Sequence, residues 1–351
     1  MNPQNHKVLV IATSRKTRGG ITSVVKAHAQ GEQWKAYHCK WIETQIDRNI
    51  LTKLFYLVTS FFQFIFLVPF YDIVHVHTAT CDCATLKSPF VFISKLLRKK
   101  VVIHLHIGNQ VDEYIDHWFF NYILRSADHV IVLSYVIKDK IRRLYNVGNK
   151  MSVIYNPCLE INFTSYLNRK KQILFAGILN KNKGYEDLIN AFALLAVKYP
   201  EWKVIFAGNG EIENAKALVI NLKIQNQVEF KGWITGEEKD ILFKDTSVLC
   251  LASYEEGFPM AVIDAWSYGI PVVCTPVGGL PDIVKNGENA LIFNCGDIEN
   301  LAIQLEKLIS DENLRNKIAK ESIILCETIF KLVNINKQIG DLYESLFEQI
   351  N

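Results

Sequence analysis

Short runs of apolar residues recur along the chain, and between them lie segments whose apolar positions have helical spacing. The runs are four to seven residues long and rich in Val, Ile and Leu, which is typical of buried strands in parallel sheets. The predicted strands are 7–12, 72–77, 101–107, 128–134, 152–157, 172–177, 203–208, 228–233, 247–253 and 271–274. Their alternation with helices predicts an α/β protein.

The alternation is interrupted once, near the middle of the chain. Residues 158–171 carry no strong pattern, and strands alternate with helices again from residue 172. The last segment has apolar residues at helical spacing, including Leu342, Tyr343 and Leu346, and predicts an amphipathic helix. The expected parts are two α/β domains over 1–158 and 172–327, a linker over 159–171, and a helical segment over 328–351.

The most hydrophobic window is residues 51–70, which is close to the length of a membrane span. A spanning helix is excluded because it would put strands 7–12 and 72–77, which should share a sheet, on opposite sides of a membrane. Two alternatives remain: a helix buried in the core, or a helix whose outer face dips into a membrane interface. Because the polar stripe is thin, a solvent-exposed helix is the least expected outcome.

Composition fits two ordinary domains and a reducing compartment. The chain has 351 residues and is 49% hydrophobic, which is enough for two cores. Most of its eight cysteines lie within apolar runs, which is typical of reduced thiols in a cytoplasmic protein. The polar opening over residues 2–7 does not resemble a signal peptide.

The net charge of +3 hides an asymmetry between the two halves. Residues 1–158 contain 20 Lys and Arg against 10 Asp and Glu, and the remainder contains 19 against 26. A basic first half favours an anionic partner, such as lipid headgroups of a membrane surface or a pyrophosphate-linked acceptor. The cluster Lys138, Lys140, Arg142 and Arg143 is either a solvated face or a headgroup contact. Nucleic acid is not expected, because no aromatic interleaving or binding motif accompanies the basic residues.

A loop, a helix and a strand over residues 255–274 form the most strongly patterned segment. Gly257 and Pro259 interrupt regular structure before the helix, whose first N–H groups can hold an anion or a hydroxyl-rich ligand. Two acids, Glu256 and Asp264, bracket the helix start. Their separation of eight residues corresponds to about 12 Å along a helix axis, which suits the two ends of a nucleotide-sugar.

This segment resembles the acid–seven residues–acid signature of the retaining family 4 glycosyltransferases, which have the GT-B fold. The matching stretches are Glu256-Gly257-Phe258, Asp264-Ala265, Gly269-Ile270-Pro271-Val272-Val273 and Gly278-Gly279-Leu280-Pro281-Asp282. Asp264 is one methylene shorter than the family's usual Glu. The resemblance covers nearly the whole chain and is most specific over 172–290. It implies two Rossmann-like domains facing a cleft, with a C-terminal helix that returns to the first domain.

The resemblance also implies a donor site. Lys183-Gly184 matches the family's diphosphate-binding Lys-Gly, whereas Ile178 stands at its arginine position, where Lys181 is the candidate replacement. Glu256 would hold sugar hydroxyls and Asp264 the ribose, while Lys183 and backbone N–H groups would stabilise the departing diphosphate. The implied nucleotide-sugar-binding residues are Gly19, Gly20, Gly177, Lys183, Gly208, Trp233, Glu256, Gly257, Phe258, Pro259, Met260 and Asp264.

Histidines occur only in the first half, so a catalytic histidine must come from the N-terminal domain. His106 lies at the carboxyl end of a predicted strand, where ligands bind in open α/β sheets, and resembles the family's cleft histidine. The expected catalytic residues are therefore His106, Glu256 and Lys183, with a capped core histidine as the alternative for His106. His75, His77 and His104 match no structural zinc spacing, so no metal and no other cofactor is expected.

The implied reaction is transfer of a sugar, with retention of anomeric configuration, from a nucleotide-sugar in which UDP is the expected nucleotide. The acceptor would be a saccharide or a lipid-linked saccharide in surface-polysaccharide or lipopolysaccharide synthesis. The enzyme would be cytoplasmic and peripheral on the inner face of the membrane. One alternative is a nucleotide-sugar-binding partner without turnover, because Ile178 and Asp264 depart from the pattern. A dinucleotide-dependent oxidoreductase is disfavoured, because the loop at Gly19-Gly20 lacks a third glycine.

Overall fold

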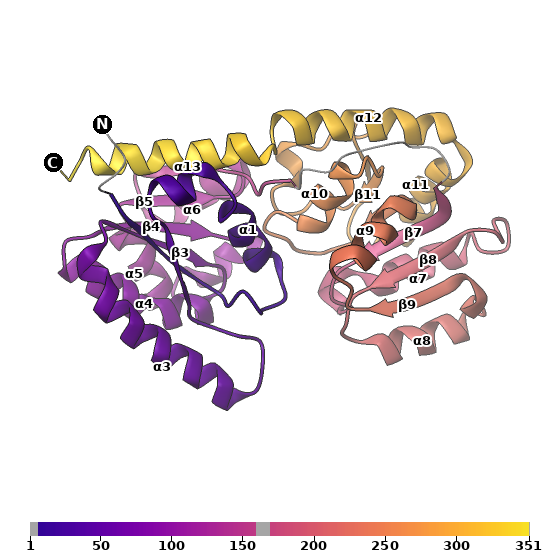
Figure 1. Cartoon of the computed structure of the whole chain (residues 1–351). Helices are drawn as coiled ribbons and strands as arrows, with labels where there is room; N and C mark the ends of the chain where they lie inside the picture. Colours follow the sequence, from indigo (N-terminus) through magenta and orange to yellow (C-terminus); the bar gives the residue numbers. More distant parts are fainter. Residues whose placement is uncertain (1–5, 159–168, 351) are drawn as a thin grey trace. The chain divides into compact units, whose positions relative to one another are not determined.

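A computed structural model describes residues 6–158 and 169–350, which form two compact units (Figure 1). The first unit comprises residues 1–157 together with 330–351, and the second comprises residues 158–329. Most of the predicted linker, 159–168, lies outside the described residues. Its predicted end at residue 171 is wrong, because the first strand of the second unit already begins at Lys170.

The first unit contains a six-stranded sheet in the order β2-β1-β3-β4-β5-β6, and all neighbouring strands pair in parallel. The strands are β1 (Val8–Ala12), β2 (Lys40–Glu43), β3 (Ile73–Thr78), β4 (Lys100–Leu105), β5 (His129–Val132) and β6 (Met151–Val153). The helices are α1 (Gly20–His28), α2 (Glu32–Ala36), α3 (Ile50–Leu67), α4 (Cys81–Leu96), α5 (Trp118–Ser126), α6 (Tyr135–Tyr145) and α13 (Leu332–Phe347), with 3-10 turns η2 (Val68–Phe70) and η3 (Asn109–Tyr114).

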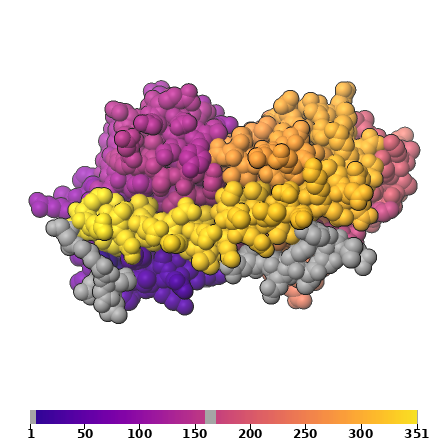
Figure 2. Space-filling model, turned by 90° about the horizontal axis from the view of Figure 1, so that it is seen from above, coloured from indigo at the N-terminus to yellow at the C-terminus, as the bar shows by residue number. Residues whose placement is uncertain are grey.

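Alternate residues of these strands build two cores, one on each face of the sheet, as the two-residue period of a strand requires. One core joins strand residues such as Val74 and Ile103 to helices α3 to α6. The other joins Val10 and Val102 to α1 and to α13, whose apolar stripe includes Ile339. Helix α13 thus packs on the sheet of the first unit, although it lies at the other end of the sequence. The outer side of α13 reaches the surface (Figure 2, yellow).

The second unit contains another parallel six-stranded sheet, in the order β12-β11-β10-β7-β8-β9. The strands are β7 (Lys170–Ala176), β8 (Lys203–Ala207), β9 (Val228–Gly232), β10 (Thr246–Leu251), β11 (Val272–Cys274) and β12 (Leu291–Ile292). The helices are α7 (Tyr185–Ala193), α8 (Ile212–Asn221), α9 (Gly236–Asp245), α10 (Met260–Ser267), α11 (Ile298–Ser310) and α12 (Glu312–Thr328), with 3-10 turns η4 (Lys181–Lys183), η5 (Gln225–Gln227) and η6 (Leu280–Asp282).

The strand order reverses once in each sheet, and this reversal predicts where a ligand binds. From β7 the chain builds β8 and β9 on one side, and then β10, β11 and β12 on the other. In open α/β sheets, ligands bind outside the carboxyl ends of the strands at such a reversal, which here lies between β7 and β10. The corresponding point of the first unit lies between β1 and β3.

Helix α3 does not lie buried in the core, which excludes the first of the two alternatives, and most of its side chains are exposed, the outcome least expected from the sequence. Of its 18 residues only Ser60 and Phe64 are buried, and the helix lies on the outside of the first unit (Figure 1). Its inner side is narrow: the rings of Phe61 and Phe64 meet Phe90 of α4 edge to face, at centroid distances of 5.8 and 5.0 Å. The rest of this apolar helix faces outward, which leaves the interfacial alternative standing.

Candidate functional site

Lys183 and Glu256 meet at the reversal point of the second sheet. Lys183 ends the 3-10 turn after β7, and Glu256 lies in the loop after β10. The Lys183 Nζ atom lies 2.5 Å from Glu256 Oε1, and Ser253 Oγ donates a hydrogen bond of 2.9 Å to the same oxygen. The two side chains are only 25% and 12% exposed, so the ion pair holds the Glu256 carboxylate in one orientation.

Glycines allow the loops around this ion pair to pack backbone against backbone. Gly184 has a φ of +65°, and a Cβ atom there would lie 2.1 Å from the carbonyl oxygen of Ala252. Gly278, with a φ of +60°, would place a Cβ 2.3 Å from the carbonyl oxygen of Glu256. No L side chain fits either position, because both the backbone conformation and the space exclude it. The glycines next to Lys183 and Glu256 therefore fix how closely the two loops approach.

Glycines also allow the loops after β7 and β8 to pack backbone against backbone. A Cβ on Gly208 would lie only 1.7 Å from the carbonyl oxygen of Gly177, whose N–H donates to the carbonyl of Ala207 at 3.0 Å. The predicted residues Gly177 and Gly208 thus lie against each other at the carboxyl edge of the sheet. Exposed Ile178 follows Gly177, and exposed Lys181 begins the 3-10 turn that ends at Lys183.

The predicted helix start is present at α10, but its relation to Glu256 differs from the expectation. Pro259 precedes the first helical residue, Met260, and Phe258 is buried in the loop before it. Glu256 therefore lies four residues ahead of the helix, so the expected 12 Å helical span between the two acids does not apply. The positive end of the α10 dipole and its first N–H groups lie just after the Glu256 loop.

Asp264 is buried within α10, and its carboxylate is already engaged. Its Oδ2 atom lies 2.6 Å from Nζ of Lys239 on α9. Sequence reasoning missed Lys239, because nothing in its own segment distinguishes it from other charged helix positions. A ligand hydroxyl reaching Asp264 must share this carboxylate with Lys239. Trp233, the expected base-binding residue, directly follows β9 and is 40% exposed.

The remaining predicted residues, Gly19, Gly20 and His106, lie in the first unit. Gly19 has a φ of +143° and precedes the first residue of α1, Gly20, in the loop after β1. His106 directly follows β4, and its Nε2 atom lies 2.9 Å from Nδ1 of His77, with which it shares a hydrogen bond. These residues thus occupy the carboxyl edge of the first sheet, the edge at which open α/β sheets bind ligands.

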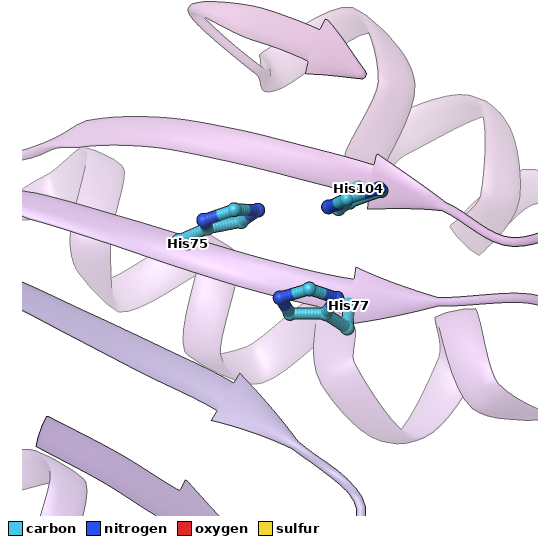
Figure 3. Close-up of side chains that lie close together, drawn as sticks. All are labelled: His75, His77 and His104. Carbon is cyan, nitrogen blue, oxygen red and sulfur yellow. The ribbon is translucent and has the colours of Figure 1, made fainter. Parts of the chain in front are cut away.

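His106 belongs to a cluster of five histidines, of which Figure 3 shows His75, His77 and His104. One ring nitrogen from each of these three lies within 4.8 Å of the others. The rings of His104 and His106 are 4.4 Å apart between centroids, and His28 of α1 lies 6.1 Å from His104. Burial lowers the pKa of His28 to about 4 and that of His106 to about 3, and it holds the pKa of the other three well below 6.5. All five imidazoles are therefore neutral near pH 7.

Two of these rings are oriented by the C-terminal helix. His75 Nδ1 lies 2.5 Å from the Tyr343 hydroxyl, and His28 Nδ1 lies 2.8 Å from Asn336 Oδ1. Among the described residues, both ring nitrogens of His104 are buried without a hydrogen-bond partner. Neutral imidazoles can bind zinc, but the grouped residues include no carboxylate to balance a buried divalent charge. The expected absence of a protein-bound metal stays a prediction.

Comparison with known proteins matches each half of the chain to a family model. Residues 4–158 match the model of glycosyltransferase family 4, and residues 160–323 match that of glycosyl transferases group 1. An uncharacterized glycosyltransferase of Haemophilus influenzae is 30% identical over 207 residues, covering 58% of this chain and 57% of that protein. The lipopolysaccharide 1,6-galactosyltransferase of Salmonella typhimurium is 29% identical over 222 residues, covering 61% and 62%. The matches thus span less than two thirds of the length of these two relatives.

A solved structure extends the likeness to the whole fold. Anabaena HepE, crystallised with UDP and glucose, superposes with a TM-score of 0.76 at 20% identity, over 97% of this chain and all of that one. This likeness confirms the predicted GT-B fold with its two Rossmann-like sheets. Because both halves of its sequence match the corresponding family models, the protein belongs to the glycosyltransferases of family 4 and group 1.

Proposed function

We propose that the protein transfers a hexosyl group from a UDP-sugar to a saccharide or lipid-linked saccharide acceptor, with retention of anomeric configuration. The observation that carries the proposal is the Lys183–Glu256 ion pair at the reversal point of the second sheet. UDP and glucose in the crystals of HepE support a UDP-linked donor, and the name of the Salmonella relative supports a role in surface-polysaccharide synthesis.

The proposed mechanism uses one cation and one carboxylate that already touch. On donor binding, the Lys183 ammonium shifts toward the diphosphate and, with N–H groups at the start of α10, stabilises its growing negative charge. Glu256, still held by Ser253, then accepts hydrogen bonds from sugar hydroxyls. The bond from the anomeric carbon to the phosphate oxygen breaks, and the acceptor oxygen bonds to that carbon on the same face. The acceptor proton passes to the departing phosphate oxygen, and His106 would contact the sugar.

Two substitutions separate nucleotide binding from chemistry. Asp264→Asn is expected to raise the Kd for UDP more than it lowers kcat, because a ribose contact is the same in the ground and transition states. Lys183→Ala is expected to impair both, because phosphate charge grows during the reaction. Calorimetric UDP binding and initial-rate kinetics measure the two effects.

A matched control distinguishes a ribose contact from an effect on the α9–α10 packing. Lys239→Met removes the ammonium that pairs with Asp264 but leaves the Asp264 carboxylate in place. If Lys239→Met weakens UDP binding as much as Asp264→Asn does, Asp264 acts by holding α9 and not by binding ribose. Unchanged UDP affinity in both Asp264→Asn and Lys183→Ala would contradict the proposed site.

The acceptor is proposed to lie at the cytoplasmic face of a membrane, where the enzyme would be peripheral. The basic excess of residues 1–158 supports this location. The cluster on α6 supports it less, because Lys140 pairs with Asp112 at 2.5 Å and the guanidinium groups of Arg142 and Arg143 donate to neighbouring oxygens. The membrane contact must therefore be sought elsewhere on this unit.

Two departures from the family pattern favour a second candidate, a nucleotide-sugar-binding partner without turnover. Ile178 occupies an arginine position, and Lys239 engages the shortened acid Asp264. Thermal shift against a panel of nucleotide-sugars identifies the donor, because a ligand at 100 times its Kd adds about 2.7 kcal/mol to the free energy of unfolding. The radiolabelled form of that donor then decides between the two: transfer or hydrolysis supports the enzyme, and binding with neither supports the partner.

A further inference from the structure

Helix α3 carries a continuous apolar face that the protein itself does not cover. Within the described residues 6–158 and 169–350, residues Ile50–Phe70 form the one helical segment long and apolar enough to cross a membrane. Large apolar side chains of this segment that are between 38% and 80% exposed make up what we name the α3 outer face: Ile50, Leu51, Leu54, Phe55, Val58, Phe62, Ile65, Phe66 and Phe70. Most of them recur at steps of three or four positions, which places them on one side of the helix.

The topology excludes a spanning helix and fixes how α3 can meet a bilayer. The strands before and after it, β2 and β3, both pair with β1 in one sheet. The inner side of the helix is attached to α4 through Phe61, Phe64 and Phe90. A crossing would separate β2 from β3, so α3 can contact a membrane only lengthwise, with its inner side on the protein and its exposed outer face toward the bilayer.

Basic groups lie at both ends of this face, and acidic ones are scarce around it. Arg48 and Lys53 are exposed at its start, where Lys53 Nζ lies 4.0 Å from Oδ1 of exposed Asp47, and Arg98 is exposed in the turn between α4 and β4. That turn is tied to the end of the segment, because Lys99 Nζ donates a hydrogen bond of 2.9 Å to the carbonyl oxygen of Pro69. No Asp or Glu occurs within residues 50–70, nor between Asp82 and Asp112. The apolar side chains match the acyl chains of an anionic membrane surface, and the cations at their two ends match its headgroups.

We propose that the α3 outer face docks into the headgroup–acyl boundary of an anionic bilayer, with the helix parallel to the membrane plane. This inference deepens the proposed function and rests on it for its purpose, since a lipid-linked acceptor is held at the same boundary. A second copy of the chain is the competing occupant, but it would bring together two sets of the cations Arg48, Lys53 and Arg98, which outnumber the acid at the start of the face, Asp47.

The test measures co-sedimentation with vesicles of phosphatidylcholine alone and of phosphatidylcholine and phosphatidylglycerol in equal parts. The wild-type protein should sediment with the anionic vesicles and be released by added salt. The variant carrying Leu51→Gln, Phe55→Gln, Phe62→Gln and Phe66→Gln should bind them at least roughly tenfold more weakly. Its fold should be unchanged, because these side chains face solvent.

A matched control carries the same four apolar-to-Gln changes on exposed positions of the second unit: Val197, Ile220, Ile241 and Ile303. It should bind anionic vesicles as the wild type does. Equal sedimentation of the α3 variant and the wild type, or no sedimentation of the wild type with either vesicle, overturns the proposal. A wild-type dimer in gel filtration that the α3 variant converts to a monomer also overturns it, because the face is then an interface between copies.

Transfer to a water-soluble acceptor analogue, measured without lipid, separates this proposal from the proposed function. The α3 variant should keep the wild-type rate there and lose transfer only to a lipid-linked acceptor in vesicles. A wild-type protein that binds anionic vesicles through α3 but transfers no sugar to either acceptor leaves the docking surface in place and refutes the transferase proposal.

Discussion

Replacing Glu256 with alanine is expected to lower kcat at least about a hundredfold, which corresponds to about 2.7 kcal/mol of transition-state stabilisation. Glu256 is proposed to hold the donor sugar while charge develops at its anomeric carbon, and the contact with Lys183 at 2.5 Å places the carboxylate next to the cation proposed for the diphosphate. The measurement is initial-rate kinetics with the donor that binds most tightly. Glu256→Gln should recover part of the loss, because an amide keeps one acceptor oxygen for sugar hydroxyls.

Two controls keep this result interpretable. Glu256→Ala leaves the partly buried ammonium of Lys183 without its partner, so thermal unfolding must be recorded to separate lost activity from lost stability. Glu213, an exposed acid on α8 of the same unit, provides the matched substitution, and Glu213→Ala should keep the wild-type rate. Wild-type kinetics in a folded Glu256→Ala protein would remove Glu256 from the mechanism.

Acidification from about pH 7 to about pH 5 is expected to destabilise the protein steeply. Burial holds the pKa values of five clustered histidines below 6.5, so the folded chain binds fewer protons there than the unfolded chain. Stability is therefore complete above the ordinary pKa of 6.5 and falls as the pH drops below it, by up to about 1.4 kcal/mol per pH unit for each histidine. The loss continues to about pH 4 for His28 and to about pH 3 for His106. Urea unfolding at a series of pH values measures it.

Single substitutions test whether the five-histidine cluster causes this pH dependence of the free energy of unfolding. His104→Phe should reduce the pH dependence by about one proton while changing stability little near pH 7, because both nitrogens of this buried ring lack partners among the described residues. The matched control is His38→Asn at an exposed position with a φ of 44°, a conformation that Asn tolerates. An unaltered slope in His104→Phe would mean that other groups cause the acid sensitivity.

The sequence predicts most of the fold because buried parallel strands are continuous apolar runs. The two strands it missed are atypical for this reason. β2 (Lys40–Glu43) begins and ends with charged residues, and β12 (Leu291–Ile292) is only two residues long. For α3 the sequence could not decide between a buried and an interfacial helix, because hydrophobicity alone does not say what covers a helix. Its outward face becomes visible only when its narrow contact with Phe90 is known.

Within the site, residues on glycine-rich loops could be predicted and those on ordinary helices could not. Lys183 and Glu256 are next to glycines that belong to the family's sequence signature, so both could be predicted. The structure brings their side chains into contact. Lys239 pairs with Asp264 through a contact between two helices, which no local pattern encodes. The five-histidine cluster was only partly visible, because His28 joins it from a separate helix.

The return of α13 to the first unit sets an order on folding during synthesis. The second unit is one unbroken stretch, 158–329, and the ribosome completes it before α13 is made. Until α13 emerges, His28 and His75 lack Asn336 and Tyr343, and the apolar sheet face around Val10 lacks the cover that α13 provides. We therefore expect the first unit, although it is made first, to complete its native packing only after the second unit has been translated.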